Sequence, residues 1–325
     1  MPASTSTLPR LTNAQAPLTC EVDAVNEYGE TQKVAIPAER ALTVYVDKRE
    51  LVTLMTLGAN PELLVLGYLR NQRLVKDVSD IDSITVDWDV GAAAVKTRHG
   101  IEDIEEKTAR RVVTTGCGQG SVFGGLMDEV DEIVLPADAH MTQAQLYSLV
   151  NTIRLKETTY KSAGSVHACA LFAMTAGDPE MLLFVEDVGR HNAIDTIAGW
   201  MSMHSVAPTL GTDVSSLPPE GANFPRGGPS ENSNPYGGMA FYTTGRLTSE
   251  MVIKSAQMGV PIVVSRSGIT QMGHQVAQTV GLCAIGRATN KRFVCYANPQ
   301  RLKLQPELAG ARPVHSSSSS SSSSS

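Results

Sequence analysis

MAFYTTGRLTSEMVIKSAQMGVPIVV, residues 239–264, decides the fold class of this chain. An apolar run predicts a strand, a glycine and arginine form a turn, an amphipathic stretch predicts a helix, and VPIVV predicts a buried strand. Thr248 can cap the helix, while Glu250 in its first turn complements the helix dipole and stands one turn before Lys254. The order strand, helix, strand is typical of α/β folds.

Strands and helices alternate over most of the chain. HACALFAM and MLLFVEDV, separated by the turn TAGDPE, predict an antiparallel pair of strands, and Thr142 with Gln145 resembles a capping box before a helix. Further elements are expected at residues 42–46 and 83–90, from Asn60 and Pro61 onward, in EEKTARRVVTTG, and in HQVAQTVGLCAIGRA and RFVCYANPQRL. Together they predict a three-layer α/β/α fold with a mixed sheet.

The chain is expected to hold one folded domain with flexible additions. Residues 1–38 are mixed polar sequence and predict a flexible N-terminal segment before a domain at residues 39–303. Residues 202–238 are rich in Pro, Gly, Ser and Asn without an apolar period, which predicts a disordered insertion. Residues 304–325 end in ten serines and predict a disordered tail.

Composition excludes several classes of protein. The net charge of −6 and the absence of a Lys/Arg-rich run argue against a nucleic-acid partner. Apolar stretches such as MLLFV are far shorter than the roughly 20 residues of a membrane span. Five widely spaced cysteines without a CxxC pair argue against a disulfide framework or a closed zinc site, so a cytoplasmic protein is expected.

TTGCGQGS, residues 114–121, surrounds Cys117 with glycines. Glycines keep bulk away from the sulfur and let backbone N–H groups converge on an anion, which suits a thiolate or persulfide of lowered pKa. The same octapeptide is compatible with a small apolar cysteine in a flexible turn. The loop alone leaves both interpretations open.

Two further turns combine glycine with arginine. EDVGRHN, which contains Arg190 and His191, lies where a strand gives way to a helix, and the turn that contains Arg246 repeats this arrangement. Such turns meet at the edge of an α/β sheet, where helix N-termini and arginine bind phosphate groups. His191 is a candidate for proton exchange. A solvated strand end with an Asp/Arg pair is the alternative, and His167 at the start of an apolar strand is more typical of packing.

The sequence lacks the motifs of two common kinds of functional site. Nucleobase deaminases need an H-x-E or C-x-E ligand and base followed by P-C-x-x-C, and neither pattern occurs. The glycine spacing of GCGQGS also differs from the G-x-G-x-x-G loop that binds dinucleotides. Cys169, Cys283 and Cys295 lie in apolar stretches and are expected to be packing residues.

Five blocks in this order resemble the formate dehydrogenase accessory sulfur-carrier family, FdhD. They are the TTGCG loop, SAGSVHACALF, VEDVGRHNAIDTIAGW, TTGRLTSEMVIKSAQMGVPIVVSRSG and GLCAIGRATNKRFVCYANPQRL. EDVGRHNAID is the most specific block, and the resemblance spans roughly residues 40–200 and 239–303. It implies an α/β/α core like that of cytidine deaminases, without the zinc site.

The resemblance also implies a function and a set of site residues. A sulfur carrier accepts a persulfide from a cysteine desulfurase and passes the sulfur to the molybdenum bis-guanine-dinucleotide cofactor of formate dehydrogenase. By position, Cys117 matches the persulfide-bearing cysteine, and Arg190, His191 and Arg246 fall in blocks that contact the cofactor. FVCYAN matches the cofactor-binding segment near the C-terminus, namely Phe293, Val294, Cys295, Tyr296, Ala297 and Asn298.

The chain departs from the family pattern at several points. Gly120 replaces a second cysteine that many members carry, TTGR replaces SGR, and the 202–238 insertion and the serine tail are unusual. Two other functions stay open: a chaperone that holds the cofactor without carrying sulfur, and a hydrolase that uses Cys117 with His167 or His191 as base. A homodimer is possible on general grounds.

Overall fold

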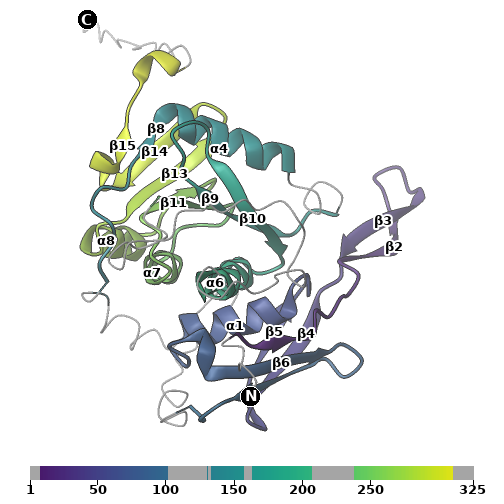
Figure 1. Cartoon of the computed structure of the whole chain (residues 1–325). Coiled ribbons are helices and arrows are strands. Elements are labelled where there is room, and N and C mark those ends of the chain that lie inside the picture. The colour runs from purple at the N-terminus through teal and green to yellow at the C-terminus, as the bar shows by residue number, and fades with distance from the viewer. Residues whose placement is uncertain (1–7, 102–129, 131–132, 157–162, 207–237, 310–325) are drawn as a thin grey trace, which may run out of the picture.

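The computed structural model describes residues 8–101, 130, 133–156, 163–206 and 238–309. Two main sheets lie on either side of a layer of helices (Figure 1). The strands are β1 Arg10–Leu11, β2 Thr19–Val25, β3 Thr31–Pro37, β4 Arg40–Val46, β5 Arg49–Thr56, β6 Ile81–Asp87, β7 Ala92–Thr97, β8 Met141–Thr142, β9 His167–Ala173, β10 Glu180–Asp187, β11 Met239–Thr243, β12 Ile262–Ser265, β13 Cys283–Thr289, β14 Arg292–Ala297 and β15 Leu302–Lys303. The α-helices are α1 Pro61–Asn71, α4 Gln143–Lys156, α6 Arg190–Val206, α7 Ser249–Gln257 and α8 Gln271–Thr279.

The larger sheet has six strands in the order β10-β9-β11-β12-β13-β14. β9 and β10 form the predicted antiparallel pair, and β11, β12 and β13 run parallel, joined by α7 and α8. Because β9 is antiparallel to both of its neighbours, β10 runs in the same direction as β11. The carboxyl ends of β10, β11, β12 and β13 therefore lie at one edge, and the expected α/β class with a mixed sheet is confirmed.

Helices cover both faces of this sheet because its strands are apolar on both sides. Ala170 and Phe172 pack toward α4, whereas Cys169 and Leu171 pack into a second cluster with α6, α7 and α8. The capping box of α4 is present, with the amide of Thr142 donating to Gln145 and the amide of Gln145 donating to Thr142 Oγ1.

The strands expected at 42–46 and 83–90 do not join this sheet, and here the structure corrects the expected three layers. They are β4 and β6 of a five-stranded sheet, β1-β6-β7-β4-β5, which lies on the far side of α1 and α6 (Figure 1). β5 and β7 were missed by sequence reasoning. Apolar alternation shows that a strand has a buried face, but it does not show which sheet the strand joins.

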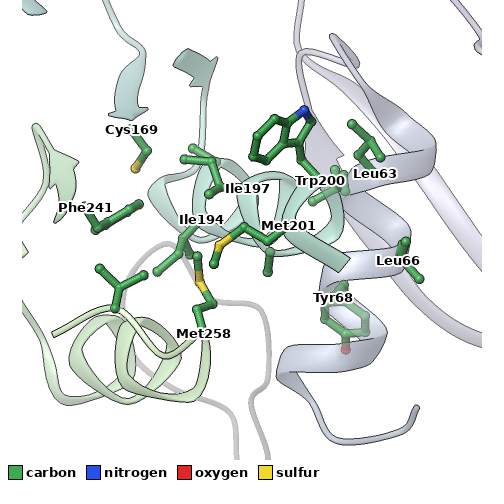
Figure 2. Close-up of a cluster of buried hydrophobic side chains, with 14 of the residues drawn as sticks. Leu63, Leu66, Tyr68, Cys169, Ile194, Ile197, Trp200, Met201, Phe241 and Met258 are labelled. Atoms are coloured by element: carbon green, nitrogen blue, oxygen red, sulfur yellow. The ribbon is translucent and has the colours of Figure 1, made fainter. Parts of the chain in front are cut away.

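α1 and α6 approach so closely that glycine is required at their crossing. A Cβ on Gly67 would meet the backbone oxygen of Asp195, and one on Gly199 would meet the backbone oxygen of Leu63. Figure 2 shows side chains of the two helices, among them Tyr68 and Trp200, around this contact. α6 lies between the two sheets, and its residues 190–203 are all buried.

The N-terminal segment expected at residues 1–38 contains regular secondary structure. Residues 19–37 form the hairpin β2 and β3, which projects from the body of the protein (Figure 1). α6 extends to Val206, so the first residues of the expected disordered insertion at 202–238 are helical. Within the described ranges, no helix combines the length and apolar character needed to cross a membrane.

Candidate functional site

Three consecutive strand ends at the carboxyl edge of the large sheet are followed by arginine-bearing turns. β10 is followed by Arg190 at the start of α6, β11 by Arg246 before α7, and β12 by Arg266 before α8. Sequence reasoning found the first two and missed Arg266, although it also directly follows a buried strand. The edge thus joins positive side chains with helix N-termini, a combination that binds anions.

The turns after β11 and β12 are bonded to one another, so the edge is a defined surface. The amide of Leu247 donates to Gly268 O over 2.9 Å. Ser265 Oγ donates to Gly245 O over 2.6 Å, and Ser267 Oγ donates to Thr244 O over 2.9 Å. Hydroxyl groups of one turn therefore fix the backbone of the other.

The side chain of Arg190 lies against the turn after β11 and is buried there. A Cβ on Gly245 would come within 2.7 Å of Arg190 Cδ, so glycine leaves the space that the arginine occupies. The Nε of Arg190 and the Oγ1 of Thr248, the N-cap residue of α7, are buried without a hydrogen-bond partner among the described residues. Buried polar atoms are normally satisfied, and a ligand at this edge would satisfy these.

His191 is a neutral imidazole at ordinary pH. Burial, opposed by the Glu250 carboxylate, lowers the pKa of His191 to about 3. Its Nε2 lies 3.5 Å from Glu250 Oε2, and its Nδ1 has no partner among the described residues. Because the neutral ring that donates from Nε2 carries a lone pair on Nδ1, this atom can accept a hydrogen bond from a ligand. Proton exchange by His191 near neutral pH, as expected from sequence, does not fit this pKa.

His167, at the start of β9, lies beside the same edge. Its Nδ1 is 3.4 Å from Thr244 Oγ1. Burial, with smaller effects from Arg190 and Arg246, lowers its pKa. Two imidazoles close to the arginine turns are therefore biased toward the neutral form.

Asp187, which ends β10, connects the site to the smaller sheet. Its carboxylate accepts hydrogen bonds from Thr56 and Leu57 at the end of β5 and from Gly189 and Asn192 at the start of α6. Burial raises the pKa of Asp187, and these hydrogen bonds oppose that effect. The residue positions the start of α6 and is enclosed by protein partners.

A buried polar chain continues from the site into the helix layer. Glu250 lies between His191 and Lys254, with 3.5 Å separating its Oε1 from Lys254 Nζ. Lys254 Nζ in turn lies 2.9 Å from Asp195 Oδ1. Burial would lower the pKa of Lys254, but Asp195 and Glu250 outweigh it and raise that pKa. This row of charged side chains thus connects His191 to the interior of the helix layer.

The predicted segment from Phe293 to Asn298 is not brought together as one surface. Phe293 and Cys295 pack on the face of the sheet that α4 covers, away from α6 and α7. Val294 is exposed and Ala297 is buried.

The last part of this segment lies partly beside the turn after β12. A Cβ on Gly286 would come within 2.7 Å of the Tyr296 ring and within 2.8 Å of Ser267 O. Asn298 has φ of 50° and donates from Nδ2 to Ala277 O and Leu282 O. Tyr296 therefore lies beside the turn that contains Arg266. The hydrogen bonds of Asn298 fix the backbone that follows β14.

The predicted nucleophile Cys117 and its loop lie outside the described residues, as does the strand expected in EEKTARRVVTTG. Cys169 is fully buried, and burial raises its pKa to about 12, which suits a packing residue. Cys283 and Cys295 pack in the cluster under α4, as expected of packing residues, and their Sγ atoms lie 3.9 Å apart. The two cysteines are twelve positions apart, and no spacing rule in the sequence indicates this contact.

Comparison with known proteins agrees with the order of motifs. A model of the FdhD/NarQ family matches residues 37–216 and 227–303. The sulfur carrier protein FdhD of Bacillus subtilis (strain 168) is 27% identical over 280 residues, which cover 85% of this chain and 94% of that protein. The protein of the same name from Bacillus pumilus (strain SAFR-032) is 26% identical over 291 residues, covering 87% and 92%.

A solved structure is similar in fold. It is the crystal structure of a protein from Desulfotalea psychrophila described as a formate dehydrogenase accessory protein, with a TM-score of 0.62 and 21% sequence identity. The likeness covers 88% of this chain and 100% of that chain. At this identity it bears on the fold alone.

Proposed function

The chain belongs to the FdhD/NarQ family, and from this premise we propose that it is a sulfur carrier that holds a persulfide on Cys117. Relatives that cover most of both chains carry the name sulfur carrier protein FdhD, which supports the proposal. The glycines around Cys117 suit a reactive thiolate because they leave the sulfur accessible and free backbone N–H groups to face it.

In the loading step, the Cys117 thiolate attacks the outer sulfur of a persulfide on a cysteine desulfurase. A bond forms between Cys117 Sγ and that sulfur, the S–S bond of the donor breaks, and the donor cysteine leaves as a thiolate. No electrons are gained or lost overall, since the terminal sulfur moves from one cysteine to another.

The acceptor in this proposal is the molybdenum bis-guanine-dinucleotide cofactor, which is a substrate of the carrier. The observation that carries this part is the arginine-bearing edge, with the buried, unpartnered Nε of Arg190 among the described residues. Arg190 and Arg246 would bind phosphate oxygens, and His191 Nδ1 would accept a hydrogen bond from the ligand. Binding there would bring the cofactor to the carrier, where proximity accelerates transfer.

In this proposal the protein works with two partner enzymes. A cysteine desulfurase supplies sulfur, and formate dehydrogenase or a related molybdoenzyme receives the sulfurated cofactor. The helix-covered six-stranded sheet is the part that would correspond to a cytidine-deaminase-like core. Two copies of the chain would form a homodimer.

A single-turnover chase tests the transfer. The protein is loaded with radiolabelled sulfur by a desulfurase, separated from it, and mixed with the cofactor. Wild type should pass label to the cofactor, whereas Cys117→Ala should neither load nor transfer. Cys20→Ser removes an exposed thiol on β2 and is the matched control, expected to behave as wild type. Equal transfer by wild type and Cys117→Ala would refute the role of Cys117.

A chaperone that delivers the cofactor without carrying sulfur is the second candidate, and the same basic edge favours it. It predicts that Cys117→Ser retains both cofactor binding and activation of the client enzyme. The hydrolase alternative with His191 as base is disfavoured, because a pKa of about 3 makes this imidazole a weak base.

A further inference from the structure

Cys283 and Cys295 form a close pair of thiols on neighbouring antiparallel strands. Their Sγ atoms lie 3.9 Å apart. Ala284 pairs with Ala297 and Ile285 pairs with Cys295, so the register shifts by one residue between these two positions. Cys283 and Cys295 therefore occupy diagonal positions on the same face of the sheet, which α4 covers.

The side chains of this pair pack on the face of the sheet that α4 covers, opposite the face that α6, α7 and α8 cover. Cys283 is the first residue of β13, and its amide donates to Pro261 O just before β12 begins. Cys283 lies level with Ile262 at the amino end of β12, and Cys295 pairs with Ile285, whose partner on β12 is Val264. The two thiols are thus separate from the site described above.

The two thiols differ in access and in acidity. Cys283 is 0% exposed, whereas Cys295 is partly exposed on β14, an edge strand of the sheet. The hydrogen bond between them raises the pKa of Cys283 and lowers the pKa of Cys295. This arrangement separates an accessible nucleophile from a protected second thiol, which is the division of roles in a reactive dithiol.

We propose that Cys295 and Cys283 form a second sulfur-handling site in this chain, which reacts with a sulfur electrophile such as a disulfide or a persulfide. Cys295 attacks and carries the adduct, and Cys283 resolves it. The site acts independently of Cys117.

With a disulfide, the Cys295 thiolate attacks one sulfur and expels the first thiolate, leaving a mixed disulfide. Cys283 loses its proton to that thiolate, attacks Cys295 Sγ and expels the second thiolate. The protein gains a Cys283–Cys295 disulfide, and the external disulfide is reduced to two thiols. With a persulfide, Cys295 takes the outer sulfur, and the same attack by Cys283 releases it as hydrosulfide.

Closing the bond requires the sulfurs to move from 3.9 Å to the roughly 2.05 Å of a disulfide. Among the residues that the structure describes, β14 pairs with β13 alone, and this ladder is already irregular at this point. Side-chain rotation and a small shift of an edge strand are therefore the movements needed.

The test uses the full-length protein with Cys20→Ser and Cys117→Ser, so that its outcome does not depend on the proposed function. The reduced protein is incubated with glutathione disulfide in one arm and glutathione persulfide in the other, and peptides are mapped by mass spectrometry. We expect a Cys283–Cys295 disulfide in at least one arm, and the reacting arm identifies the electrophile.

Two further variants separate the roles. Cys283→Ala should accumulate the glutathione adduct or the persulfide on Cys295, and Cys295→Ala should leave Cys283 unmodified. Cys169, buried and with its pKa raised to about 12, is an internal control that should react at least about tenfold more slowly than Cys295. If Cys295 reacts no faster than Cys169, or if neither arm yields the Cys283–Cys295 disulfide, the proposal is wrong.

Discussion

Lys254 and Asp195 form an ion pair inside the helix layer, with Lys254 Nζ 2.9 Å from Asp195 Oδ1 and side chains that are 1% and 0% exposed. Asp195 also accepts a hydrogen bond of 2.7 Å from Asn71 Nδ2. The pair therefore joins α7 to α6, and the amide adds α1. Through Glu250 the same charges reach His191, so the stability of this layer and the position of the candidate site are coupled.

Lys254→Met should strongly destabilise the protein. It leaves the Asp195 carboxylate buried without its cation, and loss of one partner of a buried pair costs about 3–5 kcal/mol. Urea unfolding, followed by circular dichroism, measures the free energy of unfolding. Lys33→Met breaks an exposed ion pair with Asp23 and should change it by less than about 1 kcal/mol. A Lys254→Met variant as stable as the Lys33→Met variant would show that the pair does not hold the layer.

Gly67→Ala should destabilise the protein although alanine favours helices. The new Cβ would meet the backbone oxygen of Asp195, so α1 and α6 must separate at a net cost of about 2 kcal/mol, after the helix preference of alanine has offset part of the overpacking cost. Gly177→Ala is the matched control, because a Cβ there meets only Thr175 Oγ1 at 3.9 Å. Thermal unfolding of both variants gives the comparison, and equal melting temperatures would contradict the close approach of the helices.

Because of His191, the free energy of unfolding should depend on pH below 6.5, the pKa of histidine in the unfolded chain. Its pKa is lowered from 6.5 to about 3, so the unfolded chain binds a proton that the folded protein excludes. The neutral imidazole thus contributes stability that is complete above pH 6.5 and is lost as pH falls toward 3. The stability of wild type relative to His191→Gln should fall by roughly 1.4 kcal/mol per pH unit below 6.5. A difference in unfolding free energy that is equal at pH 7 and pH 5 would argue against a buried, neutral His191.

The arginine turns should bind the nucleotide end of the proposed cofactor. Guanosine diphosphate is a suitable probe, and Arg246→Ala should weaken its binding about tenfold by removing a charge-assisted hydrogen bond. Gly245→Ala should also weaken binding, since its Cβ would displace Arg190.

Gly238→Ala is the matched control for this measurement, because its Cβ would meet Met174 O at an ordinary 3.7 Å. Titration calorimetry of the four proteins gives the dissociation constants. Affinities for the probe that are unchanged in both Arg246→Ala and Gly245→Ala would remove the arginine turns from the proposed site.

Local patterns in the sequence predicted elements well and their assembly less well. The run from Met239 to Val264 forms the predicted strand, helix and strand because its turn, cap position and apolar periods agree. The alternating strand β4 was also recognised, but its membership of a second sheet was not. Pairing depends on contacts distant in sequence, which periodicity does not encode.

The same limit applies to the candidate site. Arg190 and Arg246 were found because each follows a strand and a glycine, and the structure places Arg190 against Gly245. The contact between Cys283 and Cys295 depends on a register shift between β13 and β14, and the low pKa of His191 depends on burial by other elements. Neither property is local to the residues concerned.

Whether Cys117 carries sulfur is decided by intact-mass spectrometry after incubation of the protein with a cysteine desulfurase and cysteine. We expect the wild-type protein to gain the mass of one sulfur atom, peptide mapping to assign it to Cys117, and Cys117→Ala to show no gain. An unchanged mass of the wild-type protein, or a gain of sulfur that Cys117→Ala retains, would contradict it.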